Sequence, residues 1–297
     1  MMNILLHEIP TIQPAYIKSR PSKICKTPYV ADATIDNVDI MLHTPSLGCC
    51  GLVEKESSVL VSTIPIKKSK TKDDKPKCSH KTELAFYNEN ENTTIIGVNP
   101  NLAEIIAKSA LIYNCIQNLT LQSINSFSQQ STFLNSRFDF SGIDCNGKEF
   151  IMEIKNVPLA DYVDVPKKER KKYLKQIENM KYDEKISYFP DGYRKSNKDV
   201  VSPRALKHVQ ELETIATTTN KRAILCFVIQ RTDIKQFQPS NIDLTYKAAV
   251  QKAWLNGVEI KTLVAKWTTD GKCYFVRNDL PICLFEEEGP YLPNVNN

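Results

Sequence analysis

Hydrophobic and polar positions change their period near residue 98, which divides the chain in two. Before that point apolar residues recur in short runs separated by turn residues, at 15–19, 28–35, 38–44, 58–64, 82–88 and 93–98. Short strands with no helix between them are typical of a small barrel. A lysine-rich segment at 67–77 interrupts this pattern. Residues 1–14 show no clear period, so we expect a loose leader there.

The second part alternates between the periods of helices and strands. Asn99-Pro100 suits the start of a helix, and the apolar stretch that follows predicts a well-buried one. Further helices are expected from Ser202-Pro203 onward and near 244–255. The continuous apolar run at 223–230 predicts a strand buried on both faces, and another strand follows at 258–267. The pattern therefore predicts an all-β barrel over 15–97, an α/β domain with a mixed sheet over 98–285 and a tail over 286–297.

Composition fits a soluble globular protein, with 41% hydrophobic residues, 25% charged residues and a net charge of +5. That mild excess is compatible with a polyanionic partner, although it is common without one. No apolar run reaches the ~18 residues that a membrane helix needs. The start lacks the features of a signal peptide, and the nine cysteines are scattered without a CxxC pair. We expect an intracellular protein, cytoplasmic or nucleoid/nuclear, with no membrane association and no structural zinc.

The segment SRFDFSGIDCNGKEFIMEIKN, residues 136–156, is predicted to be a hairpin with its turn at Asn146-Gly147. A two-residue loop would place Asp139 opposite residue 154, and a three-residue loop would place it opposite Glu153. Either register brings the two carboxylates to the same end of neighbouring strands. Strand alternation predicts that Phe138 and Phe140 share a packed face. The other face should present the charged side chains together: Arg137, Asp139, Glu153 and Lys155.

Two carboxylates held this close repel each other unless a cation or a proton lies between them. Oxygen ligands suit Mg²⁺, or Mn²⁺ in its place, and Lys155 could position a metal-bound water. Such a set is sufficient for hydrolysis of a phosphodiester bond. The alternative is a surface hairpin with charges facing solvent, because the D…ExK pattern is short and frequent.

Further motifs run in order along the chain. They are MLHTPSLGCCG (41–51), SHKTEL (79–84), IIGVNPNLA (96–103), RFDF, FIMEIKNVPL, FPD (189–191), SPRALKHVQEL (202–212), AILCFVIQR (223–231) and the segment 237–260. This series resembles the sugar fermentation stimulation protein (SfsA) family over roughly residues 15–285. The resemblance implies an OB-fold-like barrel, DNA binding and a restriction-endonuclease-like domain of the PD-(D/E)xK type. It also implies Asp139, Glu153 and Lys155 as the catalytic set, with the metal on Asp139, Glu153 and the Ile154 carbonyl.

Basic residues outside the hairpin are candidates for nucleic-acid contacts. Residues 166–185 read as an amphipathic helix, whose basic run is either a phosphate clamp or a solvated face: Lys167, Lys168, Arg170, Lys171 and Lys172. Arg204, Lys207 and His208 match the family's helix stripe, and they would contact the scissile phosphate or orient Glu153. Arg137 beside Asp139 is a further candidate.

Several positions depart from the family pattern. Ser109 stands where the family usually has a Glu, and Glu104 lies one turn and a residue earlier as an accessory candidate. Ser128 and Gln130 fall where a Glu and a Lys are usual. The barrel's turn reads TPSLG, with Ser46 and Leu47 at recognition positions, and His43 nearby is a further accessory candidate.

These departures keep rival interpretations open. One is a metal-dependent nuclease acting on DNA or RNA, and another is a DNA-binding protein that retains the nuclease fold without cleavage. A third interpretation is a purely structural role, but such a role would not require Asp139, Glu153 and Lys155 to be kept together. A monomer and a dimer are both compatible with the sequence.

Overall fold

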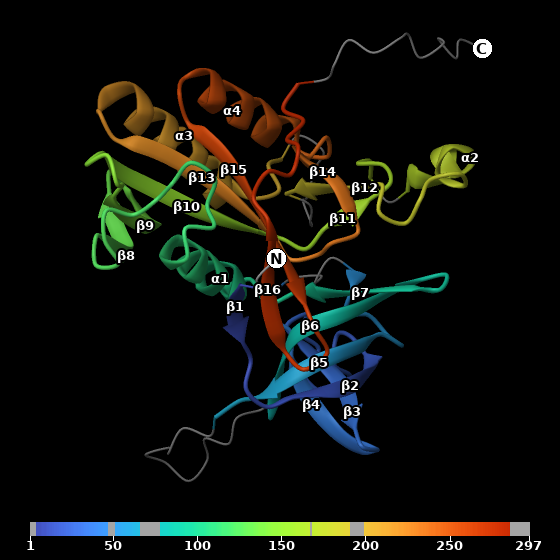
Figure 1. Cartoon of the computed structure of the whole chain (residues 1–297). Coiled ribbons are helices and arrows are strands. Elements are labelled where there is room, and N and C mark those ends of the chain that lie inside the picture. Colours follow the sequence, from blue (N-terminus) through green and yellow to red (C-terminus); the bar gives the residue numbers. More distant parts are fainter. Residues whose placement is uncertain (1–3, 47–50, 66–77, 167, 191–198, 286–297) are drawn as a thin grey trace, which may run out of the picture.

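The computed structural model describes residues 4–46, 51–65, 78–166, 168–190 and 199–285. A β-barrel formed by the first part of the chain lies below an α/β domain formed by the second part (Figure 1). The predicted fold class, an OB-like barrel followed by a mixed-sheet α/β domain, is confirmed.

The barrel contains all six strands that the hydrophobic runs predict: β2 (Ile12–Ser19), β3 (Val30–Ile35), β4 (Val38–His43), β5 (Ser58–Thr63), β6 (His80–Glu89) and β7 (Asn92–Gly97). They pair in the order β4-β3-β2-β5-β6-β7, and a short parallel pairing of β4 with β6 closes the ring. Alternate residues of these strands, such as Ile17, Ala31 and Val59, fill the interior. Of the expected TPSLG turn, Leu47 and Gly48 lie outside the described residues, as does the segment 67–77.

The α/β domain is built on a seven-stranded sheet in the order β1-β16-β15-β13-β10-β9-β8. Its members are β1 (Leu5–Glu8), β8 (Phe127–Phe133), β9 (Ser136–Ile143), β10 (Glu149–Val157), β13 (Arg222–Ile229), β15 (Glu259–Trp267) and β16 (Lys272–Arg277). The central strands β10, β13 and β15 run parallel, and the outer pairings are antiparallel. The buried run predicted at 223–230 forms the centre of the sheet.

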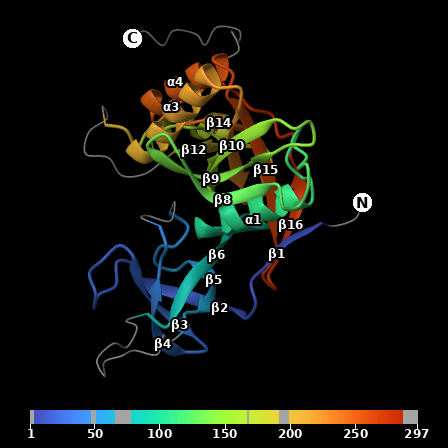
Figure 2. The same cartoon turned by 90° about the vertical axis from the view of Figure 1, so that its left-hand side faces the viewer.

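Helices cover both faces of this sheet (Figure 2). α1 (Asn101–Ile112) packs on one face, and α3 (Pro203–Thr218) and α4 (Leu244–Leu255) pack on the other. The Ser202 hydroxyl caps α3 by accepting from the Ala205 N–H, as the Ser-Pro signal predicts. None of the described helices has the length and apolar character needed to cross a bilayer.

The prediction of one amphipathic helix over 166–185 is wrong. Only a 3-10 turn, η2 (Arg170–Tyr173), and the short α2 (Leu174–Ile177) form there. They lead into β12 (Lys185–Phe189), which joins β11 (Ala160–Asp161) and β14 (Ile234–Pro239) in a small second sheet. The stretch has too few apolar positions to cover a long helix, whereas Tyr188 in β12 is buried against Leu159 and Ile242.

The prediction of a loose leader over residues 1–14 is also wrong for residues 4–14, which the structure describes. β1 pairs antiparallel with β16, near the other end of the chain, and β2 already begins at Ile12. Leu6 and Ile9 are buried in the core beneath α1. Burial of these two apolar side chains is the physical reason that the segment is ordered.

A buried charged cluster joins the barrel to the α/β domain, and we call it the lysine cluster. The Lys185 ammonium lies 2.7 Å from Glu89 of the barrel and 3.4 Å from Asp233 of the α/β domain. Its Nζ also lies 3.8 Å from the ring centroid of Tyr182 and 4.6 Å from that of Tyr162. Lys185 is fully buried, and its charge is compensated from both sides of the interface.

Candidate active site

The hairpin of β9 and β10 has the longer of the two predicted loops. Asp144 N–H bonds to the Lys148 carbonyl at 2.9 Å, and Gly147 adopts a φ of +76° in the turn between them. The paired residues run from Glu149 with Ile143 to Met152 with Phe140. One position further along, Asp139 comes level with Glu153. The register is therefore the second of the two that the sequence allows.

The faces of the hairpin differ from expectation. Phe138 packs among the residues under α3, with its ring 5.7 Å from that of His208, whereas Phe140 packs under α1. The two phenylalanines therefore do not share a face. Strand geometry is irregular here, because Gln130, level with Asp139 on β8, has a φ of +57°. Both faces are covered by helices, so the carboxylates are buried rather than displayed on an open polar face.

Asp139 is held by the backbone of β10. Its Oδ2 accepts a hydrogen bond from the Ile154 N–H at 2.7 Å, and the residue is 9% exposed. Burial, together with the nearby charge of Glu153, raises the pKa of Asp139 to about 7. In a strand the N–H and C=O of one residue point to the same side. The Ile154 carbonyl is therefore directed toward the Asp139 side of β10.

The two carboxylate oxygens of Glu153 differ in their hydrogen bonding. Oε1 accepts from both Lys155 Nζ and His208 Nδ1, whereas Oε2 is buried with no hydrogen-bond partner among the described residues. Burial alone would raise the pKa of Glu153, but the His208 hydrogen bond and the Lys155 charge outweigh it, and the net pKa is lowered. Glu153 is thus an anion at neutral pH with one free oxygen, at only 3% exposure.

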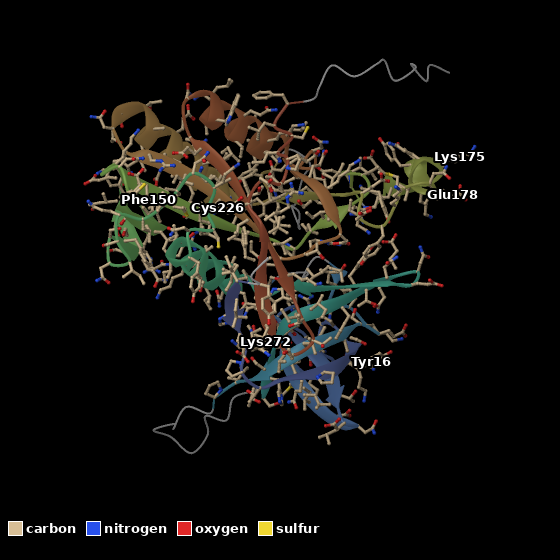
Figure 3. All side chains as sticks on the ribbon, in the orientation of Figure 1. Tyr16, Phe150, Lys175, Glu178, Cys226 and Lys272 are labelled. Atoms are coloured by element: carbon tan, nitrogen blue, oxygen red, sulfur yellow. The ribbon has the colours of Figure 1, made fainter. Side chains whose placement is uncertain are left out.

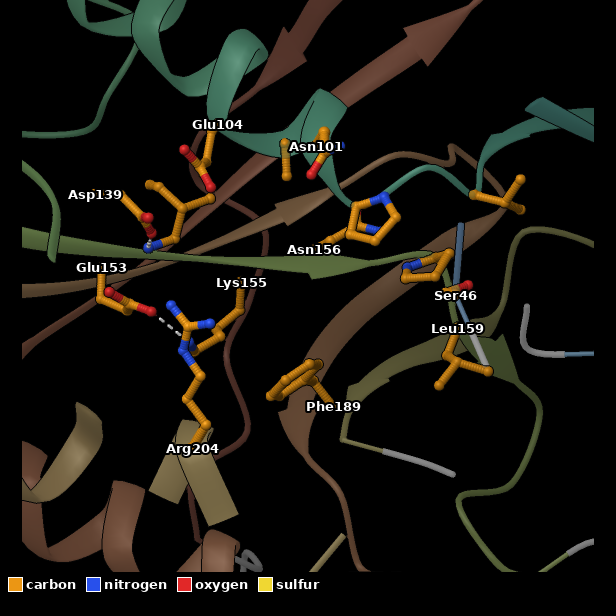
Figure 4. Close-up of a pocket in the computed structure, with 15 residues that line it drawn as sticks. Ser46, Asn101, Glu104, Asp139, Glu153, Lys155, Asn156, Leu159, Phe189 and Arg204 are labelled. Atoms are coloured by element: carbon orange, nitrogen blue, oxygen red, sulfur yellow. Dashed lines mark hydrogen bonds and ion pairs between the residues drawn. The ribbon is translucent and has the colours of Figure 1, made fainter. Parts of the chain in front are cut away.

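A cavity of about 350 Å³ opens over these groups (Figure 4). Asp139, Glu153, Ile154 and Lys155 line it together with residues from distant segments: Ser46, Val98, Pro100, Asn101, Ala103, Glu104, Asn156, Pro158, Leu159, Phe189 and Arg204. The barrel contributes Ser46 from the turn after β4. The cavity therefore lies between the barrel and the α/β domain.

Glu104, the accessory candidate, lines the cavity, whereas Ser109 does not. Glu104 lines the cavity from the first turn of α1, and its charge contributes to the raised pKa of Asp139. Its Oε2 accepts from Gln130 Nε2 at 2.7 Å. Gln130, which stands in place of a usual charged residue, is thus tied to the site through Glu104.

The donor set fits a hard divalent cation. Two carboxylates and one main-chain carbonyl would supply oxygen ligands and leave other positions to water, as Mg²⁺ prefers. The buried Oε2 of Glu153, which has no hydrogen-bond partner among the described residues, is an acceptor that such a cation could use. Across the described ranges, no group of three or more His, Cys, Asp or Glu side chains is arranged to hold a metal, so the site would depend on the carbonyl and water.

The three residues of the predicted basic stripe on α3 have different surroundings. Arg204 points into the cavity, and no described residue bonds to its guanidinium (Figure 4). His208 is buried and bonds to Glu153, so it orients the carboxylate. Lys207 faces away, bonding to the Asn135 carbonyl at 2.8 Å and pairing with Glu211 at 3.6 Å. Of the three, only Arg204 is placed to reach a phosphate in the cavity.

The other predicted contact residues do not line the cavity. Arg170 is committed internally, to Asp161 at 2.5 Å and to the Tyr188 hydroxyl at 3.1 Å. Lys168, Lys171 and Lys172 are exposed beside α2, whose Lys175 and Glu178 lie at the outer edge of the molecule (Figure 3). Lys167 lies outside the described residues.

Two further candidates lie on strands away from the cavity lining. Arg137 is exposed on β9. His43 is partly buried at the end of β4, where burial and the neighbouring Lys81 lower its pKa. Neither Arg137, a candidate for nucleic-acid contact, nor His43, an accessory candidate, lines the cavity.

Tyr246 is a neighbour of the site that sequence reasoning missed. It is fully buried on α4, and its hydroxyl has no hydrogen-bond partner among the described residues. Burial, together with the charge of Glu153, raises its pKa well above the usual value. Its sequence context, a tyrosine among the apolar residues of an expected helix, carries no signal that would distinguish it from an ordinary core residue.

Comparisons with known proteins point to one family. The profile described as "Sugar fermentation stimulation protein RE domain" matches residues 101–271. A curated sugar fermentation stimulation protein homolog of Clostridium tetani is 24% identical over 233 residues, which cover 78% of this chain and 83% of that protein. A homolog of Clostridium perfringens strain SM101 is 25% identical over 87% of this chain and 92% of its own length.

A solved structure shares the whole architecture. It is described as the structure of Pyrococcus furiosus SfsA in complex with Ca²⁺, and it is similar with a TM-score of 0.67 at 14% identity. The match covers 94% of this chain and 99% of that one. At this identity the similarity establishes the fold, including both the barrel and the α/β domain.

Proposed function

Because this chain belongs to the sugar fermentation stimulation protein (SfsA) family, we propose that it binds nucleic acid and hydrolyses phosphodiester bonds with a divalent cation. The single observation that carries this proposal is the buried Oε2 of Glu153, which has no hydrogen-bond partner among the described residues and lies at a cavity shared with Asp139. Lys155 and His208 hold the charge of Glu153 on Oε1, so Oε2 remains as an acceptor that a cation in the cavity could use.

Asp139, Glu153 and the Ile154 carbonyl would hold the cation, Mg²⁺ or Mn²⁺. The Ca²⁺ complex of Pyrococcus furiosus SfsA supports a divalent site in this fold. When bound, such a cation lowers the pKa of water and neutralises charge on a phosphate.

The protein's own residues supply the remaining functions. Lys155 places an ammonium beside Glu153, where it orients the attacking water and compensates charge that develops on the phosphate. Arg204, unpaired and directed into the cavity, holds the phosphate oxygens. His208 is a positioning residue, because it fixes the Glu153 carboxylate without lining the cavity.

DNA is the partner that we propose, with RNA as an open alternative substrate. The net charge of +5 and the exposed lysines beside α2 favour a polyanion. The described cysteines are all free, which fits a reducing compartment that contains nucleic acid. We therefore place the protein in the cytoplasm or with the nucleoid or nuclear DNA.

The second candidate function is DNA binding without cleavage. The substitution that favours it is Gln130, a neutral residue where a charged one is usual, bonded to Glu104 at the rim of the site. Nicking of a supercoiled plasmid with Mg²⁺, with Mn²⁺ and with EDTA separates the two. Metal-dependent nicking that disappears in Glu153→Gln supports the nuclease. Binding of the same plasmid with no nicking in either metal would overturn cleavage and leave the binding function.

A further inference from the structure

The carboxylates lie deep in a small cavity. Asp139 and Glu153 are 9% and 3% exposed, and the space above them is about 350 Å³. That volume is at the lower end of the range for pockets that hold one small molecule. A base-paired duplex presents its phosphates on the outside of a wide rod, whereas a single unpaired nucleotide can enter such a cavity, and a nucleotide taken from a duplex must first leave the helix.

The lining suits one nucleotide. Phe189 offers an aromatic ring, and its packing against Phe227 at 6.0 Å and Tyr246 at 5.4 Å holds that ring in place. The exposed Asn101 at the mouth supplies an amide that can bond to a base edge. Arg204 enters from the other side, next to the carboxylates (Figure 4). An aromatic platform, an amide and a guanidinium are the groups that proteins use to hold an unstacked base and its phosphate.

The cavity is held at this width by the junction of barrel and α/β domain. Ser46 of the barrel forms one wall, and the lysine cluster fixes the two parts against each other. The two parts also meet at Gly97, whose N–H bonds to the Gln230 carbonyl. No side chain would fit at this position, because a Cβ on residue 97 would lie 1.9 Å from Gln230 Oε1. Parts joined by such buried polar contacts do not separate readily to admit a wider ligand.

From these observations we propose that the site acts on an unpaired strand, with one nucleotide entering the cavity so that its phosphate meets Asp139 and Glu153. Phe189 is the stacking platform for that nucleotide. The substrate class is thus single-stranded nucleic acid, or a duplex at a gap, bubble or frayed end. This inference rests on the proposed function for its cleavage step, but entry of a nucleotide can be measured without cleavage.

The cleavage test compares one labelled sequence as a single strand, inside a short unpaired bubble and as a fully paired duplex, in Mg²⁺ or Mn²⁺. We expect the single strand and the bubble to be cut at least about tenfold faster than the duplex, since extruding a paired nucleotide costs a few kcal/mol. A duplex cut as fast as the single strand overturns the inference while leaving the nuclease function intact.

The binding test uses 2-aminopurine placed at successive positions of the single strand, with Ca²⁺ so that binding is read without turnover. We expect quenching at one position by Phe189, and a rise of about twofold or more at that position in Phe189→Leu, which keeps an apolar side chain but removes the ring. Tyr113→Leu, at an exposed tyrosine outside the cavity, is the matched control.

Failure of the two proposals is distinguishable. If no nucleic acid is cut but the quenching depends on Phe189, the nuclease function fails and entry of a nucleotide is supported. If the fluorescence is the same at every position and in Phe189→Leu, entry of a nucleotide is overturned whatever the cleavage assay shows.

Discussion

His208 on α3 bonds through Nδ1 to Oε1 of Glu153 on β10, while Oε2 of the same carboxylate is buried with no hydrogen-bond partner in the described part of the chain. The helix and the strand are more than fifty residues apart in sequence, yet the contact fixes which oxygen of Glu153 is available. A buried carboxylate with one tied and one free oxygen is oriented for a ligand before the ligand arrives.

Removal of His208 should weaken the divalent site without removing a ligand. In His208→Ala, Glu153 loses the hydrogen bond that lowers its pKa and can rotate, so we expect divalent affinity to fall by about 10- to 100-fold. Titration calorimetry with Mn²⁺ measures this. Lys207→Ala on the same helix is the control, because Lys207 faces Asn135 rather than Glu153. Equal affinities in wild type and His208→Ala would refute a positioning role.

Asp139 should make stability depend on pH. Its pKa is about 7 in the folded protein against an ordinary value of 3.8, so between these values the folded state holds a proton that the unfolded chain has lost. Stability should therefore fall as pH rises through this window, by at most about 4 kcal/mol. In EDTA, Asp139→Asn should raise Tm relative to wild type at pH 8 and have much less effect at pH 4.

The exposed Asp183 provides the comparison for that measurement. Asp183→Asn should change Tm equally at both pH values. A parallel pH profile for wild type and Asp139→Asn would contradict the raised pKa.

Charge changes at the site should separate chemistry from binding. Asp139→Ala and Lys155→Ala should each reduce metal-dependent cleavage by orders of magnitude. Without metal, DNA binding should hold or improve in Asp139→Ala, because a negative charge near the phosphate is lost, and should weaken modestly in Lys155→Ala. Filter binding in EDTA measures this, and affinities that change in the same direction would exclude direct phosphate contact.

The exposed lysines beside α2 should govern the salt dependence of binding. Each phosphate contact contributes about 0.9 to the slope of log affinity against log salt on duplex DNA, or about 0.7 on a single strand. Neutralising Lys168, Lys171 and Lys172 together should therefore lower the slope by up to about 2 to 3. A slope unchanged by the triple variant would identify a solvated face. Arg170→Ala should instead lower Tm, because Arg170 pairs with Asp161 inside the fold.

The lysine cluster should dominate the stability of the domain junction. Lys185→Ala leaves Glu89 without its cation and Asp233 with Arg231 alone, and loss of one partner from a buried ion pair costs about 3–5 kcal/mol. Lys172→Ala, which breaks only an exposed pair with Glu169, should change the free energy of unfolding by less than about 1 kcal/mol. Urea denaturation of the two variants makes the comparison, and equal midpoints would refute the assignment.

Local patterns carried much of the fold. Alternation and turn residues were enough to predict six barrel strands, the hairpin with Asp139 and Glu153 at one end, and the helices that begin at Ser202 and end before Gly257. Those features depend on residues that are close in sequence, where periodicity and capping act.

The missed features depend on partners far along the chain. Lys185 read as the polar end of an amphipathic helix, because nothing nearby in sequence announces Glu89 or the tyrosines that bury it. Phe138 and Phe140 were assigned one face, because the irregular geometry beside Gln130 leaves no mark in the alternation. The cavity wall at Ser46 and Phe189 exists only once the barrel and the second sheet meet.

The pairing of β1 with β16 determines the order in which the barrel and the α/β sheet can form during synthesis. During synthesis Leu5–Glu8 leaves the ribosome long before its partner Lys272–Arg277, because the barrel and most of the α/β domain lie between them in sequence. The barrel strands lie between them and can close while β1 waits with its edge exposed. The α/β sheet therefore cannot be completed until Lys272–Arg277 has been synthesised, so a ribosome that stalls before residue 272 would leave a finished barrel attached to an open sheet.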